Sequence, residues 1–288
     1  MNILVLGANG MLGSAMIKVI SEVSDYKVYG TIRSNSLVEK ISLLAPKAII
    51  LRGIDVLDSD SLLDALTISR PSVIVNCVGL IKQLAEVNDP LRVLPINSLL
   101  PHRLAKLAKL LDAKLIHIST DCVFSGDKGG YFEFDISDAK DLYGRSKFIG
   151  EVYGDNAVTL RTSIIGHELN GSNGLLEWFL SQNDKCNGYS KVIFSGLPTV
   201  SLSRIIRDYV ITRPKMTGLY HVASEPISKF NLLKIISEVY KKDIDIVSDE
   251  ALNINRSLNA SKFKNFTGFI SPAWRELVAE MHEFQFKE

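Results

Sequence analysis

Residues 1–13 read MNILVLGANGMLG, which places a glycine-rich loop directly after a short apolar strand and before a helix. Glycine is needed where the backbone turns sharply and where a pyrophosphate must approach the main chain closely. The N-terminus of the helix that follows offers free N–H groups to the phosphates. Tight turns also use glycine, but the position of this loop between strand and helix predicts a dinucleotide site. The loop residues expected to contact the dinucleotide are Gly7, Asn9, Gly10, Met11, Leu12 and Gly13.

Around this loop, the first 165 residues alternate short β-branched runs with longer helical patterns. Strands are predicted at 2–6, 27–32, 47–51, 72–77, 114–118 and 157–161, and helices at 11–22, 59–68, 96–111 and 143–154. Most of these strands are apolar on both faces, as strands buried in a parallel sheet are. The alternation predicts an α/β fold of the Rossmann type with a doubly wound parallel sheet.

The regularity weakens after residue 166, where a stretch rich in Asn, Gly and Ser begins. We expect that stretch, 167–190, to be irregular. The elements predicted after it are strands at 191–194 and 218–222, and helices at 201–212, from Ser228 onward and at 272–286. We therefore assign residues 1–165 to a dinucleotide-binding domain that carries the catalytic residues. Residues 166–288 are assigned mainly to a substrate-binding lobe, partly interleaved with the first domain.

The composition is that of an ordinary globular protein and narrows the possible partners. The 288 residues carry a formal net charge of +1 with scattered basic residues, which predicts neither a nucleic-acid nor a membrane surface. Cys77, Cys122 and Cys186 lie far apart, match no zinc or disulfide spacing and suit a reducing cytoplasm. No transmembrane run or signal peptide is predicted, and no metal site.

The ends of the next strands bear on the choice of cofactor. Enzymes that use NAD usually carry an acid after the second strand, whereas this chain has Arg33 and Ser34, which suit the 2′-phosphate of NADP. A solvated surface arginine is the alternative for Arg33. After the third strand, the Asp55 carboxylate could bond the adenine amino group, and at the end of the fourth strand small residues leave room for the ribose and nicotinamide. Either segment could instead be an ordinary loop that follows a strand. These further candidates are Asp55, Val56, Cys77, Val78 and Gly79.

The reactive groups are predicted in two segments. Tyr143 and Lys147 are four residues apart and share one face of a helix, where an ammonium near the phenol would favour the phenolate. The spacing alone proves little, since Tyr-x-x-x-Lys is expected by chance in a chain with this many tyrosines and lysines. Its position after the fifth strand strengthens it, because Thr120 lies where the carboxyl end of that strand opens toward the crevice in which ligands bind in such sheets. A threonine hydroxyl there can donate to a substrate carbonyl.

These segments resemble a known family. The blocks Ser119-Thr120-Asp121-Cys122-Val123-Phe124-Ser125-Gly126 and Tyr143-Gly144-Arg145-Ser146-Lys147-Phe148-Ile149-Gly150-Glu151 are similar to those of the extended short-chain dehydrogenase/reductases. Within them, the dTDP-4-dehydrorhamnose reductase group of sugar-nucleotide reductases is the best match. The resemblance covers residues 1–165 well and the remainder more loosely.

The resemblance implies roles for the matching residues. Tyr143 would protonate the sugar C4 oxygen as hydride arrives from NADPH, and Lys147 would lower the pKa of that tyrosine and hold the nicotinamide ribose. Thr120 matches the hydroxyl donor of the family, with Asp121 beside it as a further substrate residue. Asn97 resembles a position that orders the site, although helix packing explains it equally well.

Two departures from the family pattern affect the substrate. Arg256 matches an arginine near the substrate diphosphate, but Ser257 replaces the proline that usually follows it. The loop at 135–142 lacks the prolines common in rhamnose-pathway reductases, and it borders the sugar site. The identity of the sugar is therefore left open.

The leading prediction is an NADPH-dependent 4-keto-6-deoxysugar reductase, acting on a nucleotide-linked sugar for a surface polysaccharide and possibly forming a homodimer. One alternative is an epimerase or dehydratase on the same scaffold, which Asp121 keeps open. The other is a non-catalytic NADP-binding regulatory subunit that retains the fold.

Overall fold

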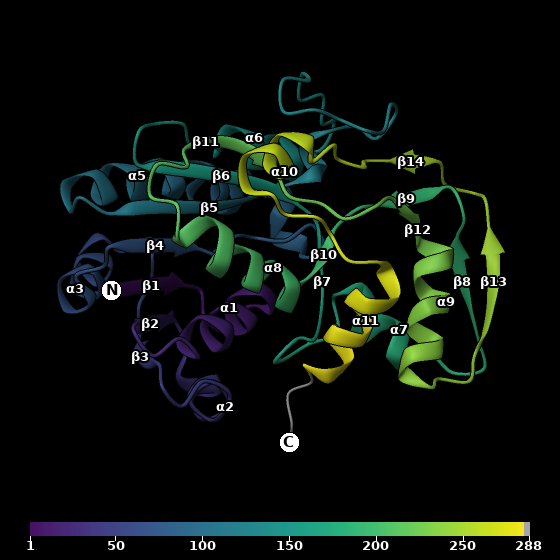
Figure 1. Cartoon of the computed structure of the whole chain (residues 1–288), viewed down its shortest axis with the longest axis horizontal. Coiled ribbons are helices and arrows are strands. Elements are labelled where there is room, and N and C mark those ends of the chain that lie inside the picture. Colours follow the sequence, from purple (N-terminus) through teal and green to yellow (C-terminus); the bar gives the residue numbers. More distant parts are fainter. Residues whose placement is uncertain (285–288) are drawn as a thin grey trace.

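A seven-stranded parallel sheet forms the centre of the computed structural model, which describes residues 1–284 (Figure 1). Its strand order is β11-β6-β5-β4-β1-β2-β3. The strands are β1 (Asn2–Leu6), β2 (Lys27–Ile32), β3 (Ile49–Arg52), β4 (Val73–Asn76), β5 (Lys114–Thr120), β6 (Ala157–Thr162) and β11 (Gly218–His221). The order reverses direction at β1, which confirms the predicted doubly wound α/β class.

Helices cover both faces of this sheet. Residues of β1 alternate between the two sides, so that Ile3 and Val5 belong to one hydrophobic core and Leu4 and Leu6 to the other. Helices that pack on the first side are α1 (Met11–Ser21), α2 (Val38–Leu44) and α8 (Thr199–Ile205). Those on the second side are α3 (Ser59–Ser69) and α5 (Leu100–Leu110).

Much of the second half of the chain forms the right-hand part of Figure 1, whereas β6, β11 and α8 of the same half lie at the central sheet. Its small sheets have the orders β12-β9-β14, β13-β8 and β10-β7. Their strands are β7 (Ile164–Ile165), β8 (Lys185–Tyr189), β9 (Val192–Phe194), β10 (Leu197–Pro198), β12 (Ile227–Ser228), β13 (Asp245–Asp249) and β14 (Ile254–Asn255). Besides α8 and the π-helical segment η5 (Ile206–Ile211) that continues it, the helices of this half include α7 (Leu175–Ser181), α9 (Lys229–Tyr240), α10 (Ser261–Thr267) and α11 (Trp274–Glu283).

Several predicted boundaries change. The stretch 167–190 is not wholly irregular, since α7 and β8 lie within it. The helix predicted at 143–154 is α6 (Leu142–Ile149) and ends at Gly150, whose Cβ would lie 1.9 Å from the Asn97 carbonyl oxygen. Of the helix predicted at 272–286, α11 accounts for Trp274–Glu283, and residues 285 and 286 lie outside the described part of the chain.

The helix predicted at 96–111 also differs. It begins earlier, as α4 (Pro90–Val93), and contains a π-helical segment, η3 (Leu94–Leu99), before α5. Asp89 caps it by accepting a hydrogen bond from the Leu91 N–H at 2.9 Å, and Pro90 occupies the first helical position. Within residues 1–284, no helix combines the length and apolar character needed to cross a bilayer.

Candidate active site

The glycine loop lies between β1 and the N-terminus of α1. Gly7 has a φ of +78°, which favours glycine, and the Gly10 N–H donates to the Gly7 carbonyl at 3.1 Å. A Cβ at Gly13 would lie 2.0 Å from the Gly7 oxygen, so only glycine allows α1 to approach the loop this closely. The first turn of α1 holds no acid and Gly10 offers no capping side chain. Its N–H groups therefore point toward the loop without a side-chain acceptor, which suits an anion.

A cleft of about 660 Å³ opens at the carboxyl ends of β1, β4, β5 and β6. This is the position where ligands bind in doubly wound sheets. The structure brings most of the predicted residues together on its walls: Asn9, Gly10, Met11, Leu12, Cys77, Val78, Gly79, Thr120, Asp121, Tyr143, Lys147 and Arg256. Gly7 and Gly13 do not line the cleft. Gly7 allows the turn of the loop, and Gly13 allows α1 to pack closely against it.

Four predicted cofactor residues lie outside the cleft, at the ends of β2 and β3. Arg33 is exposed, and the Ser34 hydroxyl accepts a hydrogen bond from the Ser36 N–H at 3.3 Å. Asp55 accepts from the Leu57 N–H at 3.0 Å, and Val56 follows it half-buried. Because β2 adjoins β1 in parallel register, these ends lie on the same sheet edge as the glycine loop. Their roles remain predictions.

Thr120 and Tyr143 come together because α6 packs tightly against the end of β5. A Cβ at Gly144 would lie 2.2 Å from the Cys122 carbonyl oxygen, and Asp141 caps α6 by accepting from the Gly144 N–H at 2.7 Å. Both side chains line the cleft, and Thr120 influences the Tyr143 hydroxyl. The Thr120 hydroxyl donates to Asp121 Oδ1 at 3.1 Å and accepts from the Cys122 N–H.

Burial raises the pKa of the Tyr143 phenol above its usual range, and the nearby Cys122 adds to the rise. Hydrogen bonding by Thr120 opposes this change only in part. The net direction is opposite to the sequence prediction, in which Lys147 lowers the pKa of Tyr143. The reason is that removal of the phenolate from water outweighs the nearby favourable groups. Surrounded by the residues of the chain alone, Tyr143 is therefore a neutral proton donor at neutral pH.

Lys147 lies one turn further along α6 and its ammonium is fixed. Its Nζ donates to the Ile118 carbonyl oxygen at 2.7 Å. Burial lowers the pKa of Lys147 to about 8, and the Glu151 carboxylate opposes that change. Glu151 is itself buried and accepts from the Ser119 hydroxyl at 2.8 Å, while Arg161 pairs with both of its oxygens.

Asn97 connects the loop after β4 to α6. Its Oδ1 accepts from the Leu80 N–H at 2.9 Å, and its Nδ2 donates to the Leu80 carbonyl and to the Ser146 hydroxyl. The π-helical segment η3 places this buried side chain between the two elements, and such segments are frequent at functional sites. Asn97 therefore packs inside its own helix and also links the loop after β4 to α6, both of which line the cleft.

Arg256 reaches the cleft from the second half of the chain. Its Nε donates to the Phe124 carbonyl at 2.8 Å, which fixes the guanidinium beside Asp121. Burial raises the pKa of Asp121, and the positive charge of Arg256 opposes the rise.

Sequence reasoning missed several residues that line the cleft, among them Lys82, Glu168 and Lys229. Lys229 begins α9, where burial lowers its pKa and Asp121 raises it. Glu168 accepts from the Gly174 N–H at 2.7 Å and holds the segment before α7 against Met11. No motif surrounds these residues; the only available signal was the Ser228 cap ahead of Lys229. Among residues 1–284, no group of three or more His, Cys, Asp or Glu side chains is arranged to hold a metal.

The chain is similar to a known protein family and to several known proteins. A family model described as RmlD substrate binding domain matches residues 1–285. Methionine adenosyltransferase 2 subunit beta of Bos taurus is 31% identical over 150 residues, which is 52% of this chain and 41% of that protein. The match therefore spans less than half the length of that relative.

A second relative matches over more of its length. The dTDP-4-dehydrorhamnose reductase of Aggregatibacter actinomycetemcomitans is 25% identical over 235 residues, which is 78% of this chain and 74% of that protein. Among solved structures, the dTDP-4-dehydrorhamnose reductase of Bacillus anthracis in complex with NADP is 22% identical, has a TM-score of 0.77 and covers 98% of both chains. This structural likeness supports the fold.

Proposed function

The chain belongs to the family of RmlD substrate binding domains, and from this premise we propose that it is an NADPH-dependent reductase of a nucleotide-linked 4-keto-6-deoxysugar. The observation that carries the proposal is the arrangement of Thr120, Tyr143 and Lys147. Two hydroxyl groups and an ammonium line the same cleft as the glycine loop. That combination suits delivery of a proton to a carbonyl oxygen while hydride reaches its carbon. We propose that the product serves the synthesis of a surface polysaccharide.

The residues at the glycine loop fit a dinucleotide. A Cβ at Gly13 would lie 2.0 Å from the Gly7 oxygen, so α1 approaches the loop more closely than any other residue would allow. Together with the uncapped start of α1, this close approach suits a bound pyrophosphate. Arg33 and Ser34 would hold the 2′-phosphate, and Cys77 to Gly79 would border the nicotinamide ribose. Bound there, NADPH would supply the hydride.

The chain itself supplies and controls the proton. The neutral Tyr143 hydroxyl would donate its proton to the carbonyl oxygen, so that the ketone becomes an alcohol and the phenolate regains a proton from solvent. The Thr120 hydroxyl would orient the same oxygen. The Lys147 ammonium would stabilise the phenolate left on Tyr143, because opposite charges favour each other strongly in a buried site.

The end of the cleft around Asp121 supports an anionic substrate. Arg256 and Lys82 both act electrostatically on Cys122 and on Lys229, so the three cations lie near one another. Two carboxylates lie among them, Asp121 and the Asp141 side chain that pairs with Lys82 at 2.6 Å. Three cations beside two acids leave one net positive charge in a partly enclosed space. Such a region suits the diphosphate of a nucleotide sugar. Lys229→Ala is expected to raise KM for such a sugar while kcat changes little.

The test is oxidation of NADPH by the purified chain in the presence of a panel of dTDP- and UDP-linked 4-keto-6-deoxysugars. Turnover with at least one of them is expected, and Tyr143→Phe is expected to lower kcat by about 10²-fold or more, the range of general acid catalysis. The matched control is Tyr189→Phe in β8, outside the cleft. Failure of every sugar in the panel, with NADPH bound, would exclude this function.

The likeness to methionine adenosyltransferase 2 subunit beta favours a second candidate, a nucleotide-binding regulatory subunit. It predicts tight NADPH binding without turnover, and no effect of Tyr143→Phe beyond cofactor affinity. The same experiment therefore separates the two candidates.

A further inference from the structure

Residues 168–174, which lie between β7 and α7, form a loop at the border of the cleft (Figure 1). We call this segment the Glu168 loop. The glycine loop lines the same cleft with residues 9–12, so the two loops face one space. The residues of the Glu168 loop that line the cleft are Glu168, Leu169, Asn170, Asn173 and Gly174. No sequence motif assigned a role to any of them.

Both ends of the Glu168 loop are fixed. Just before it, the His167 ring meets the Tyr240 hydroxyl of α9 at 2.9 Å through Nε2. Leu169 is only 8% exposed and belongs to the hydrophobic core on the α1 side of the sheet, and Gly174 is buried at the other end. Residues 170–173 between these points are exposed. Because few buried contacts hold these four residues, they can open without disturbing the core.

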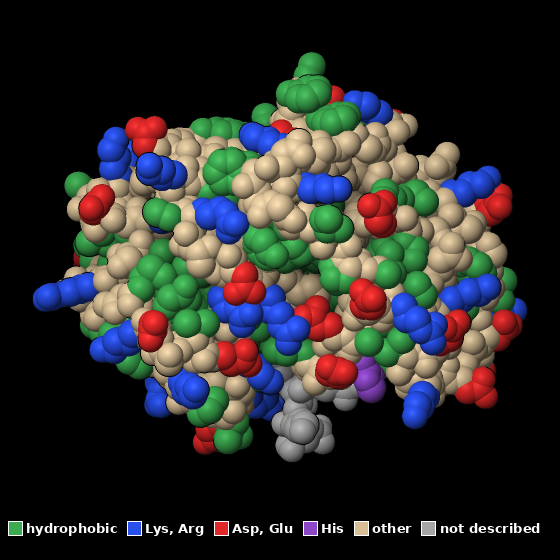
Figure 2. All heavy atoms as spheres, in the orientation of Figure 1, with side chains coloured by type: hydrophobic (Ala, Val, Ile, Leu, Met, Phe, Trp, Pro, Cys, Tyr) green, Lys and Arg blue, Asp and Glu red, His purple; other side chains and the backbone are tan. Residues whose placement is uncertain are grey.

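The Glu168 carboxylate holds the exposed part of the loop in place. Its Oε1 accepts from the Gly174 N–H at 2.7 Å, and its Oε2 accepts from the Asn173 N–H at 3.1 Å. On the face of the molecule in Figure 2, acidic side chains lie among lysines and arginines. The hydrogen-bond partners of Glu168 within residues 1–284 are instead these main-chain N–H groups. Bonds to an ionised acceptor are stronger than neutral ones, so loss of the carboxylate should release the loop.

The end of the Glu168 loop touches the start of α1. A Cβ at Gly174 would lie 2.6 Å from Met11 Cε and 2.9 Å from Glu168 Oε1, so a larger residue would displace one of these groups. Met11 is the first residue of α1. A pyrophosphate binds to the first N–H groups of such a helix. A dinucleotide bound there therefore passes beside the contact between Met11 and the loop.

We propose that the Glu168 loop closes over the bound dinucleotide and controls its release, with Glu168 as the positioning residue that keeps the loop closed. The proposal rests on the dinucleotide site of the proposed function. A reductase exchanges NADP⁺ for NADPH in every cycle, so the loop has to open once per turnover. Glu168 acts through the main chain of the loop and does not itself bind the cofactor.

The experiment measures how fast NADPH leaves the purified chain, by stopped-flow fluorescence with an excess of NADP⁺ to occupy the vacated site. Glu168→Ala is expected to raise the dissociation rate constant about tenfold or more. Tenfold corresponds to about 1.4 kcal/mol, which is no more than one hydrogen bond to a charged group contributes. Glu168→Gln keeps one acceptor oxygen and is expected to raise the rate constant about threefold.

Glu225→Ala is the matched control, since Glu225 is exposed and lies outside the cleft, and it should leave the dissociation rate constant unchanged. In the wild-type chain, NADPH should slow the hydrogen exchange of residues 169–174. An unchanged dissociation rate constant in both Glu168 variants would overturn the proposal, and so would loop exchange that NADPH leaves unaltered.

Slower dissociation from the Glu168 variants would also overturn the proposal, because it would mean that the carboxylate repels the phosphates directly. No sugar is present in these measurements. Failure of the loop proposal with NADPH bound would therefore leave the reductase function standing, and absence of sugar turnover would leave the loop proposal standing.

Discussion

Replacing Glu151 by Gln should destabilise the protein more than any conservative change at its surface. The Glu151 side chain is fully buried and accepts from the Ser119 hydroxyl at 2.8 Å, the Tyr153 hydroxyl at 2.9 Å, and Arg161 at 2.7 and 2.8 Å. All four contacts are donors. An amide offers only one acceptor oxygen, and its NH₂ group would face donors, while Arg161 would keep a buried and uncompensated charge.

Removal of one partner from a buried ion pair lowers the free energy of unfolding by about 3–5 kcal/mol. Because Gln has nearly the same shape as Glu, we expect Glu151→Gln to lie at the lower end, at about 3 kcal/mol. For a chain of this length, that loss lowers the melting temperature by roughly 5 °C. The assay is urea unfolding followed by circular dichroism, with the m-value checked for two-state behaviour.

Ser137→Ala is the matched control for this prediction. Its hydroxyl meets Arg161 Nη2 only at 3.4 Å, and its loss should change the free energy of unfolding by about 0.5 kcal/mol or less. If Glu151→Gln costs less than about 1 kcal/mol with an unchanged m-value, the buried pair does not stabilise the fold in the way argued.

Three further predictions concern the cofactor and the proton. Gly13→Ala places a Cβ 2.0 Å from the Gly7 oxygen, so it should lower the free energy of unfolding by about 1–3 kcal/mol and the NADPH affinity at least tenfold, as measured by unfolding curves and fluorescence titration. The control Gly154→Ala meets nothing closer than 3.9 Å and should change neither quantity. A Gly13→Ala protein with unchanged stability and affinity would contradict the pyrophosphate site proposed at the glycine loop. Arg33→Ala should weaken NADPH binding by about 10- to 100-fold and leave NADH binding unchanged, because only NADPH carries the 2′-phosphate; equal losses for both cofactors would count against that contact. Because the pKa of Lys147 is about 8, its ammonium is present below that pH and lost above it, so turnover should be constant at lower pH and fall about tenfold per unit above; a flat profile from pH 6 to about 10 would show that the charge is not required.

The central sheet could be predicted from the sequence because its signals are local. The bounds of β1 and β2 are those predicted, at 2–6 and 27–32, since both are apolar runs ended by glycine or polar residues. The glycine loop was identified for the same reason. Tyr143 and Lys147 were placed on one helix face by spacing alone, and α6 confirms this placement.

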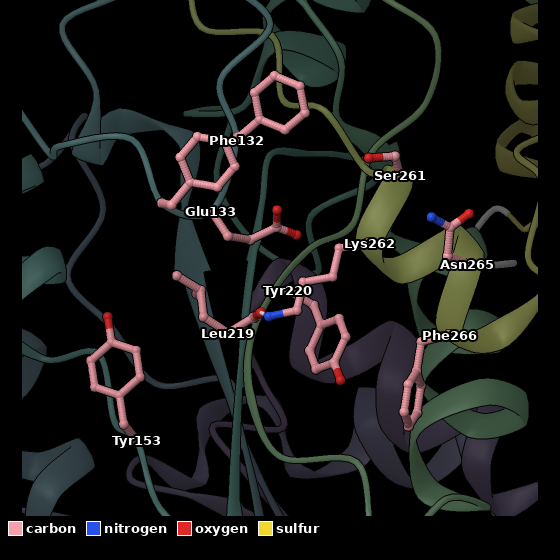
Figure 3. Close-up of a pocket in the computed structure, with 10 residues that line it drawn as sticks. Phe132, Glu133, Tyr153, Leu219, Tyr220, Ser261, Lys262, Asn265 and Phe266 are labelled. Carbon is pink, nitrogen blue, oxygen red and sulfur yellow. Dashed lines mark hydrogen bonds between the residues drawn. The ribbon is translucent and has the colours of Figure 1, made fainter.

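Other features could not be predicted because they depend on contacts between distant segments. The π-helical segment at Leu94–Leu99 arises where Asn97 reaches Leu80 and Ser146, and no residue pattern encodes that geometry. Lys229 faces Asp121 only because the second half of the chain folds back over the cleft. The groove lined by Phe134, Leu219 and Lys262 (Figure 3) likewise combines the loop around Phe134 with β11 and α10, which are more than 80 residues away along the chain.

The two departures from the family pattern are one structural unit. The Ser257 hydroxyl accepts from the Gly130 N–H at 2.9 Å, and the Ser257 carbonyl accepts from the Tyr131 N–H at 2.9 Å. The Ser257 N–H donates to Asn255 Oδ1 at 3.1 Å, a bond that proline could not make. The segment that carries Arg256 is thus fastened to the start of the loop that lacks the usual prolines. Because Asp138 in that loop in turn binds the Ser125 N–H at 2.7 Å, the altered residues reshape one wall beside the site rather than two independent surfaces. We therefore expect the proton chemistry of the family to be retained and the sugar to differ. Ser257→Pro should then alter the choice of sugar more strongly than it alters the rate of reduction by NADPH.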